Sequence, residues 1–262
     1  MTQANPPLIL CTNDDGIHAD GINALRAALA SVGEVWTVAP ETEQSGVSHA
    51  ITLHRALRIR ELAARSFAVD GTPTDCVYLA LHKLLPRPAS LVVSGINHGG
   101  NLGDDVLYSG TVSAAMEAAH HGVAAIAVSR VSHHGAVGDF EVAAQFAAAL
   151  ASHVLVHKMP KGLLLNVNVP KRATVKTPFE MCALGKHTWR PVVEERHDPR
   201  GRPYYWIGGP WDGHEDLPGT DVHAIHRGVI SVTPVRASMT DTTALSGMRA
   251  LRTVAGFSSA PE

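Results

Sequence analysis

Two adjacent carboxylates near the start of the chain are the residues whose types and spacing most clearly suggest chemistry. Asp14 and Asp15 follow the apolar run Leu-Ile-Leu-Cys at residues 8–11. Such a run is typical of a buried parallel strand, and open α/β sheets bind ligands at the carboxyl ends of such strands. Neighbouring negative charges repel each other unless a cation, a shared proton or strong donors compensate. The pair therefore predicts a hard-metal or catalytic site, although Asn-Asp-Asp-Gly is also good chemistry for a solvated turn.

Two further loops bring polar side chains toward the same edge of the sheet. Ser45 lies in a polar loop after the second predicted strand, and Asn97 and Asn101 lie in a glycine-rich loop after the third. Because parallel strands deliver their outgoing loops to one edge, we expect these side chains beside the acidic pair. Their oxygen atoms suit Mg²⁺, Mn²⁺ or Ca²⁺ and disfavour a Cys/His zinc site. An ion with so few protein ligands can polarise a phosphoryl oxygen and activate water, which predicts hydrolysis without a covalent intermediate.

The sequence Ser109-Gly110-Thr111 opens a predicted helix just after the glycine-rich loop. Ser and Thr at a helix start usually cap it, and capping alone explains one of the two. Free N–H groups and the positive end of the helix dipole also make Ser-Gly-Thr a cradle for an anion. Together with the preceding glycines, this favours phosphate binding. The chain has no Gly-Lys-Ser/Thr of a P-loop and no G-x-G-x-x-G of a dinucleotide site at the required spacing.

Alternating apolar runs and helical repeats place these loops on a mainly parallel sheet of the α/β class. Helical spacing at 22–29 followed by a strand at 34–39 predicts one βαβ unit with a right-handed crossover. Thr72-Pro73-Thr74-Asp75 has the form of a helix start. The other predicted segments are extended stretches at 51–59 and 67–69, a helix over 72–85, strands at 91–94, 123–129 and 163–169, and helices at 108–119 and 140–150.

The pattern changes from about Lys171, where helical periodicity weakens and Pro, Gly, Trp and Tyr become more frequent. Strong turn chemistry at 198–203 followed by the aromatic run 204–207 predicts a hairpin. An exposed aromatic hairpin is typical of a docking arm, with a base-stacking platform as the alternative. Alternation at 228–235 predicts a return strand before a short helical tail. We therefore divide the chain into a catalytic core at 1–170 and a smaller β-rich hairpin and oligomerisation region at 171–262, whose tail returns to the core.

The composition excludes several classes of protein. With 22 Lys and Arg against 24 Asp and Glu, the formal charge is −2, whereas nucleic-acid and anionic-membrane binders usually need a basic excess. Three widely spaced cysteines predict neither a disulfide framework nor a zinc knuckle, and we expect small buried thiols in a reducing compartment. The histidine doublets at 120–121 and 133–134 lack the H-E-x-x-H spacing of a zinc hydrolase. Without a secretory signal or a membrane span, we expect a soluble cytoplasmic protein.

Seven segments give the chain a resemblance to a known family, and they occur in family order over nearly its whole length. They are Thr-Asn-Asp-Asp-Gly-Ile at 12–17 and the segments 39–46, 70–76, 94–103, 108–111, 166–170 and 198–206. The chain resembles the SurE family of stationary-phase survival proteins, which are metal-dependent 5'/3'-nucleotidases. The tail after about Ala237 matches this family least well.

This resemblance implies an architecture and a set of partners. The core is expected to be a Rossmann-like three-layer sandwich, and the C-terminal part is expected to exchange an arm between subunits. The implied assembly is a homodimer that can pair into a homotetramer, with no membrane and no specific DNA or RNA partner. The implied cofactor is one divalent cation per subunit, Mg²⁺ or Mn²⁺, with Ca²⁺ as an alternative.

The resemblance also assigns roles to residues. It implies that the metal ligands are Asp14, Asp15, Ser45 and Asn97, and that the phosphate is held by Asn101, Ser109, Gly110 and Thr111. The metal ligands coincide with those chosen from the loops. We take Asp14, Asp15 and Asn101 as the catalytic residues, and Asp14 or a ligand-bound hydroxide as the group that takes the proton of the attacking water.

The expected reaction is hydrolysis of nucleoside 5'- and 3'-monophosphates to nucleoside and phosphate. One alternative is a non-catalytic nucleotide sensor that shares the pocket. A second is a haloacid-dehalogenase-type phosphatase, whose nucleophile lies in an Asp-x-Asp pattern with a later Lys. Asp14 and Asp15 are adjacent in the chain, so that pattern does not fit.

Overall fold

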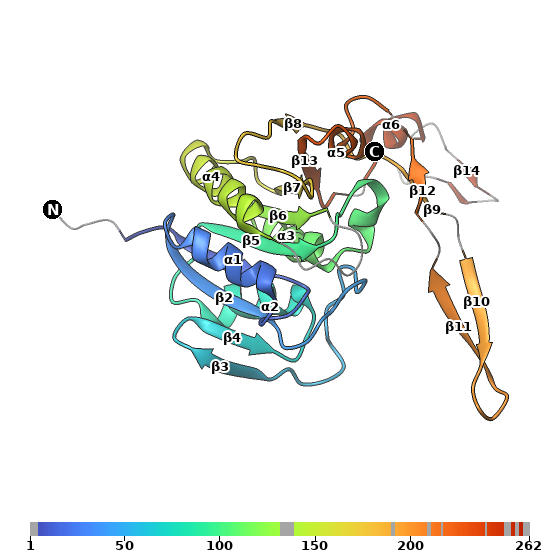
Figure 1. Ribbon diagram of the computed structural model, residues 1–262, viewed down its shortest axis with the longest axis horizontal. Helices are drawn as coiled ribbons and strands as arrows, with labels where there is room; N and C mark the ends of the chain where they lie inside the picture. Colours follow the sequence, from blue (N-terminus) through green and yellow to red (C-terminus); the bar gives the residue numbers. More distant parts are fainter. Residues whose placement is uncertain are drawn as a thin grey trace.

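A nine-stranded sheet forms the centre of the computed structural model, which describes residues 5–131, 139–189, 192–208, 211–215, 217–238, 240–248, 253–254 and 257–258 (Figure 1). In spatial order the strands are β3 (Ile59–Ala63), β4 (Ser66–Val69), β2 (Glu34–Pro40), β1 (Leu8–Thr12), β5 (Leu91–His98), β6 (Ala125–Arg130), β7 (Leu163–Val169), β13 (Ile230–Arg236) and β8 (Phe179–Met181). The predicted α/β class with a mainly parallel sheet is confirmed.

The order of the strands reverses at β1, which pairs in parallel with β2 on one side and with β5 on the other. The strands β4, β6 and β7 extend the parallel part of the sheet, while β3 and β13 pair antiparallel with β4 and β7. Thr12 at the end of β1 lies opposite Ser94 in β5. A ligand site in such a sheet is expected outside the carboxyl ends of the strands at this reversal point.

Helices cover both faces of the sheet and give the fold three layers (Figure 1). One apolar core lies under α1 (Asp20–Leu29) and α4 (Glu141–His157), and a second lies under α2 (Pro73–Leu79) and α3 (Gly110–His120). Side chains alternate along a strand, so Ile9 and Cys11 of β1 contribute to the first core and Leu10 to the second. Burial on both faces explains why the central strands are continuous apolar runs.

The starts of α2 and α3 follow the capping chemistry in the sequence. Thr72 caps α2: its hydroxyl accepts from Asp75 N, and the Asp75 carboxylate accepts from Thr72 N. Ser109 caps α3 by accepting from Val112 N at 3.1 Å. The predicted helix from 72 to 85 continues beyond α2 as the π-helical turn Ala80–Leu84, so the apolar repeat predicted the length but not the change of winding.

The largest error in the prediction is the extended stretch at 51–59, because the strand β3 begins only at Ile59. Before that point two carboxylates take the place of a neighbouring strand. Asp75 accepts from the main-chain N–H of Thr52, and Asp70 accepts from that of Arg58. The alternating apolar side chains therefore do not pack into a sheet face, and Leu53 is 74% exposed.

Two other boundaries also differ. The strand β5 continues to His98, so Asn97 lies in the strand end and not in the loop after it, and α4 runs to His157. The predicted strands at 67–69, 123–129 and 163–169 are present as β4, β6 and β7. His133 and His134 lie outside the described residues.

The C-terminal part contains a hairpin that stands away from the sheet (Figure 1). Its strands β10 (Val192–His197) and β11 (Pro203–Gly208) are antiparallel, and the Asp198 carboxylate accepts from Arg200 N and Arg202 N in the turn between them. The hairpin is confirmed, and the predicted return strand is β13. The remaining elements are β9 (His187–Trp189), β12 (Trp211–His214), α5 (Asp221–His226), α6 (Thr242–Met248), β14 (Thr253–Val254), β15 (Phe257–Ser258) and the 3₁₀ turn Gly103–Leu107. The division at residue 170 stays a prediction.

In the part of the chain that the structure describes, no helix has the length and apolar character required to cross a membrane.

Candidate active site

The adjacent carboxylates lie at the carboxyl end of β1, beside the point where the strand order reverses. Asn13 donates through Nδ2 to Gly16 O at 2.9 Å, and Gly16 has a φ of +98°, a backbone conformation that side chains rarely adopt. This turn redirects the chain from β1 toward α1. It leaves Asp14 and Asp15 at the rim of the sheet, as the sequence predicted.

Asp14 is held by the first turn of α3 and is only 3% exposed. Thr111 N donates to Asp14 Oδ2 at 3.1 Å, and the Thr111 hydroxyl donates to Oδ1. Gly110 allows this approach, because a Cβ at that position would lie 2.8 Å from Asp14 Cβ. The carboxylate therefore faces the positive end of a helix, which stabilises its negative charge.

Asp15 contacts the neighbouring strand. His98 N, at the end of β5, donates to Asp15 Oδ2 at 3.2 Å. Asn97 precedes His98 and donates through Nδ2 to Gly99 O at 3.0 Å. The structure therefore brings Asp15 and Asn97 to the two strand ends that flank the reversal point.

Both carboxyl groups are poorly solvated. Burial raises the pKa of Asp14 to about 6, an effect that the Thr111 hydrogen bonds reduce and the charge of Asp15 increases. Burial likewise raises the pKa of Asp15 to about 6, against the hydrogen bond from His98. Burial and mutual repulsion make the ionised forms of these two carboxyl groups unfavourable. A bound cation would offset both effects.

Ser45 is brought to the site through its neighbour. Gln44 N donates to Asp14 O at 2.8 Å, which joins the loop after β2 to the backbone of the acidic pair. The Ser45 hydroxyl donates to Glu43 Oε1 at 2.8 Å, and the residue is exposed. The loop thus reaches the site, while the Ser45 side chain contacts a residue of its own loop.

Asn101 is buried in a polar network that sequence reasoning did not find. Its Nδ2 donates to Ser129 Oγ at 2.7 Å, and its backbone N donates to Asn168 Oδ1 at 2.8 Å. Its carbonyl oxygen accepts from Asn166 Nδ2 at 2.8 Å and from Asn168 Nδ2 at 2.9 Å. A sequence signal for this network exists, because Asn166 and Asn168 lie at alternate positions of the otherwise apolar strand β7. Buried amide groups are almost always hydrogen-bonded, so such residues predict a buried polar partner.

The Ser-Gly-Thr segment has a more specific arrangement than an open anion cradle. The Thr111 hydroxyl and N–H both hold Asp14, and the Ser109 hydroxyl accepts from Val112 N. Thr111 therefore positions the carboxylate. That Asn101, Ser109, Gly110 and Thr111 bind phosphate stays a prediction.

The donor set at this rim fits a hard divalent cation. Among the described residues, no group of three or more His, Cys, Asp and Glu side chains is arranged to hold a metal. An ion here would use two carboxylates with neutral oxygens, which is the chemistry of Mg²⁺ and Mn²⁺ sites and not of zinc sites. Also within the described part, the buried Asn13 Oδ1, just after β1, and the buried Ser94 Oγ, in the middle of β5, have no hydrogen-bond partner.

Comparison with known proteins identifies similar chains over nearly the full length. The model of the family described as Survival protein SurE matches residues 9–191. The chain is 51% identical over 240 residues to 5'-nucleotidase SurE of Geobacter sulfurreducens, covering 91% of each protein. It is 51% identical over 239 residues to 5'-nucleotidase SurE of Myxococcus xanthus, covering 90% of each. The crystal structure of the SurE protein from Aquifex aeolicus superposes with a TM-score of 0.81 at 37% identity, covering 93% of this chain and 98% of that one.

Proposed function

This chain belongs to the SurE family, and from that membership and the geometry of the site we propose that it is a 5'-nucleotidase. The reaction is hydrolysis of a nucleoside monophosphate to nucleoside and phosphate, with 5'- and 3'-monophosphates as substrates. The observation that most strongly supports this proposal is the buried Asp14 carboxylate, held by Thr111 at the start of α3 and adjacent to Asp15. A structural turn would leave both carboxylates in water, without a helix terminus directed at one of them.

Asp14, Asp15, Ser45 and Asn97 are the proposed ligands of one divalent cation per subunit, Mg²⁺ or Mn²⁺. The contacts of Asp15 with His98 N and of Asp14 O with Gln44 N support this set, because they join three of the loops that contain it. When bound, such an ion polarises a phosphoryl oxygen and a water molecule.

The residues of the chain itself have three tasks. Ser109 and Gly110, at the start of α3, receive the phosphate where the helix terminus favours negative charge. Asn101 presents its amide from a backbone that Asn166 and Asn168 immobilise. Asp14 accepts the proton of the attacking water, and Thr111 keeps its carboxylate oriented for that transfer.

We propose a homodimer that can pair into a homotetramer, in which the C-terminal part exchanges an arm between subunits and the β10–β11 hairpin is a docking arm. Exposed Tyr205, Trp206 and Ile207 on the hairpin support this assembly. The three cysteines of the chain are unpaired and buried, which supports the proposal that the enzyme works in the reducing cytoplasm.

A phosphate-release assay tests this function. The purified protein is given each nucleoside 5'- and 3'-monophosphate and an aryl phosphate, with Mg²⁺, with Mn²⁺ or with chelator. We expect phosphate release that needs the cation and is lost in Asp14→Asn, while the circular dichroism and melting curves remain those of a folded protein.

The same assay separates the alternatives. Nucleotide binding without phosphate release in any metal would identify a sensor. Activity that persists both in chelator and in Asp14→Asn would contradict the proposed mechanism. A trapped aspartyl-phosphate on the protein would instead identify an Asp nucleophile.

A further inference from the structure

The segment 44–52, which contains Ser45, is fastened to the rest of the molecule on both sides of that residue. Before Ser45, Gln44 N donates to Asp14 O at 2.8 Å. After it, Ser48 N donates to Tyr108 O at 3.1 Å and Ser48 Oγ donates to Leu107 O at 2.7 Å. The segment therefore lies against the turn that leads into α3.

Glu117 of α3 provides a further attachment for the segment. His49 Nε2 lies 2.8 Å from Glu117 Oε2, and the carboxylate is nearly buried, with the residue 7% exposed. The other carboxylate oxygen, Oε1, lies 3.0 Å from Nε2 of His121, which caps the end of α3. One carboxylate thus holds one histidine of the segment and one at the end of its own helix. The hydrogen bond with His49, followed by that with His121, lowers the pKa of Glu117.

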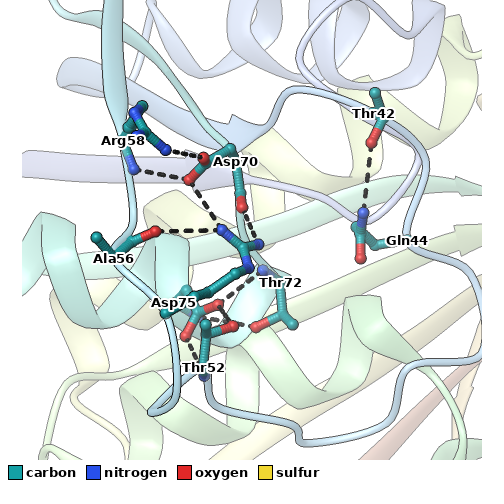
Figure 2. A network of polar contacts seen from close by, with 9 residues as sticks. Thr42, Gln44, Thr52, Ala56, Arg58, Asp70, Thr72 and Asp75 are labelled. Carbon is teal, nitrogen blue, oxygen red and sulfur yellow. Dashed lines mark hydrogen bonds and ion pairs between the residues drawn. The ribbon is translucent and has the colours of Figure 1, made fainter.

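Asp75 of α2 holds the far end of the segment (Figure 2). This carboxylate, on a residue only 1% exposed, accepts from Thr52 N at 2.8 Å and from Thr52 Oγ1 at 2.7 Å. The same carboxylate accepts from Thr72 N at 2.9 Å in the capping box of α2. Thr72 Oγ1 in turn donates to Ala50 O at 2.7 Å, so the segment is joined to the start of α2 by three contacts.

The helices that hold the segment are also those that border Asp14. A Cβ on Gly110 would lie 2.8 Å from Asp14 Cβ and 3.2 Å from Pro73 Cγ. The starts of α2 and α3 therefore meet at the carboxylate. Because Asp75 and Glu117 hold the segment against α2 and α3, they fix its position relative to Asp14 and Asp15.

Ser45 depends on these attachments because its own contacts are local. Its hydroxyl donates to Glu43, two residues away, and the next residue, Gly46, has no neighbour within 4 Å of the position its Cβ would take. Ser45 thus lies on an exposed turn between fixed points, and those points determine where its oxygen is placed.

We propose that Glu117 and Asp75 are positioning residues that hold the segment 44–52 against α2 and α3 and thereby place Ser45 beside Asp14. The inference deepens the proposed function, on which it rests, because it takes Ser45 as a ligand of the proposed cation. Neither carboxylate is assigned a role in binding the cation or the substrate. Their effect is on cation affinity and on the order of the segment.

The test uses pairs of variants that differ in whether the segment is released. His49→Ala removes the contact between Glu117 and the segment and so loosens the segment, whereas His121→Ala removes the other contact of the same carboxylate and leaves every attachment of the segment in place. Thr52→Val keeps the side-chain shape but removes the hydroxyl donor to Asp75. Its control is Thr42→Val, since Thr42 Oγ1 only accepts from Gln44 Nε2 at 3.4 Å within the same loop (Figure 2).

Hydrogen exchange reports on the attachment directly and needs no metal. We expect the amides of Ser48 and Thr52 to exchange faster in His49→Ala and Thr52→Val than in wild-type protein, and at wild-type rates in His121→Ala and Thr42→Val. Equal exchange in the test and control variants would overturn the attachment.

Calorimetric titration with Mn²⁺ reports on the placement of Ser45. We expect the dissociation constant to rise by about tenfold in His49→Ala, as for loss of one charge-assisted hydrogen bond, and to stay unchanged in His121→Ala. The kcat measured at saturating Mn²⁺ is expected to return close to the wild-type value, which mere unfolding would not allow. Equal Mn²⁺ affinity in both variants overturns the positioning role. Absence of Mn²⁺ uptake by the wild-type protein overturns the proposed function instead, and the role of Ser45 with it.

Discussion

Gly110 is the position where the first turn of α3 meets the Asp14 carboxylate. A methyl group there would lie 2.8 Å from Asp14 Cβ and 3.0 Å from Oδ2, so Gly110→Ala must displace the carboxylate. We expect a loss of kcat/KM of at least about a hundredfold from such a misplacement, with α3 still formed. Steady-state kinetics and circular dichroism measure the two effects.

The control for this variant is Gly247→Ala in α6, where a Cβ would meet no atom within 4 Å. Alanine has the higher helix propensity, so this change is expected to leave kcat/KM unchanged. Wild-type activity in Gly110→Ala would show that Asp14 need not occupy its observed place.

The raised pKa values of Asp14 and Asp15, both about 6, predict a dependence of stability on pH. A carboxyl group whose folded pKa lies above its ordinary value stabilises the fold fully below that ordinary value, and this contribution is lost as pH rises through the folded pKa. In metal-free protein the two groups should therefore lower the melting temperature as pH rises from about 4 to about 7. A bound cation needs both groups ionised and should reverse this loss.

Thermal melts with and without Mn²⁺ measure this effect. We expect the increase in melting temperature caused by Mn²⁺ to be small at about pH 5 and large at about pH 7.5. In Asp14→Asn the pH dependence of the metal-free protein should be weaker, because asparagine does not titrate. An increase that is the same at both pH values would contradict the buried, ionisable pair.

The location of Asp14 and Asp15 was predictable because its pattern is local. Adjacent aspartates after an apolar run indicated a site at the sheet rim, and the structure places Asp14 and Asp15 there. The role of Thr111 was not predictable in the same way, because its hydroxyl bonds a residue 97 positions away. Spacing within one motif cannot distinguish a phosphate ligand from a group that holds a distant carboxylate.

At the scale of elements, β7 fixes the loop that follows β5. Asn168 of β7 is fully buried, and both ends of its amide group bond the backbone of Asn101. Asn168→Ala leaves the buried Asn101 N–H without its partner. We expect the free energy of unfolding to fall by about 1–3 kcal/mol and kcat to fall with it, as measured by urea denaturation and phosphate release.

An exposed asparagine provides the comparison for this change. Asn23 donates through Nδ2 to His18 O at 3.4 Å on the surface of α1, so Asn23→Ala should change stability by less than about 0.5 kcal/mol. If both variants have the same urea midpoint of unfolding as the wild-type protein, the hydrogen bonds around Asn101 do not stabilise the fold.

Helices and strands were predictable where the spacing of apolar residues and the capping or turn residues indicated the same boundaries. The strand β7 has the predicted bounds, and α2 starts at its capping box. The stretch at 51–59 was misread because alternation alone does not make a strand. There Asp70 and Asp75 bind the backbone N–H groups that a neighbouring strand would otherwise take, and no periodicity indicates such long-range contacts.

Over the whole molecule, the hairpin β10–β11 stands away from the sheet and exposes apolar side chains (Figure 1). Ile207 is 91% exposed, and Tyr205 and Trp206 are exposed beside it. In the proposed homodimer these side chains are covered by the partner subunit. The double variant Trp206→Ser and Ile207→Ser should therefore sediment as a monomer at concentrations where the wild-type protein is a dimer.

Val156→Ser on α4 serves as the control, since Val156 is also exposed but lies away from the hairpin. It should sediment as the wild-type protein does. A dimer that survives the double variant would exclude these side chains as the main contact. The turn and the aromatic residues predict this hairpin from the sequence, whereas the pattern of one sequence does not show which surface packs against it.

The adjacent carboxylates of Asp14 and Asp15 are proposed to lie at the sheet rim in order to bind a divalent cation. Calorimetric titration of Mn²⁺ into metal-free protein at about pH 7.5, where both groups are ionised, measures this binding. We expect one site per chain in the wild-type protein, and loss of that site in Asp14→Asn and in Asp15→Asn while both variants remain folded. Failure of the wild-type protein to bind the ion, or equal affinity in all three proteins, would contradict it.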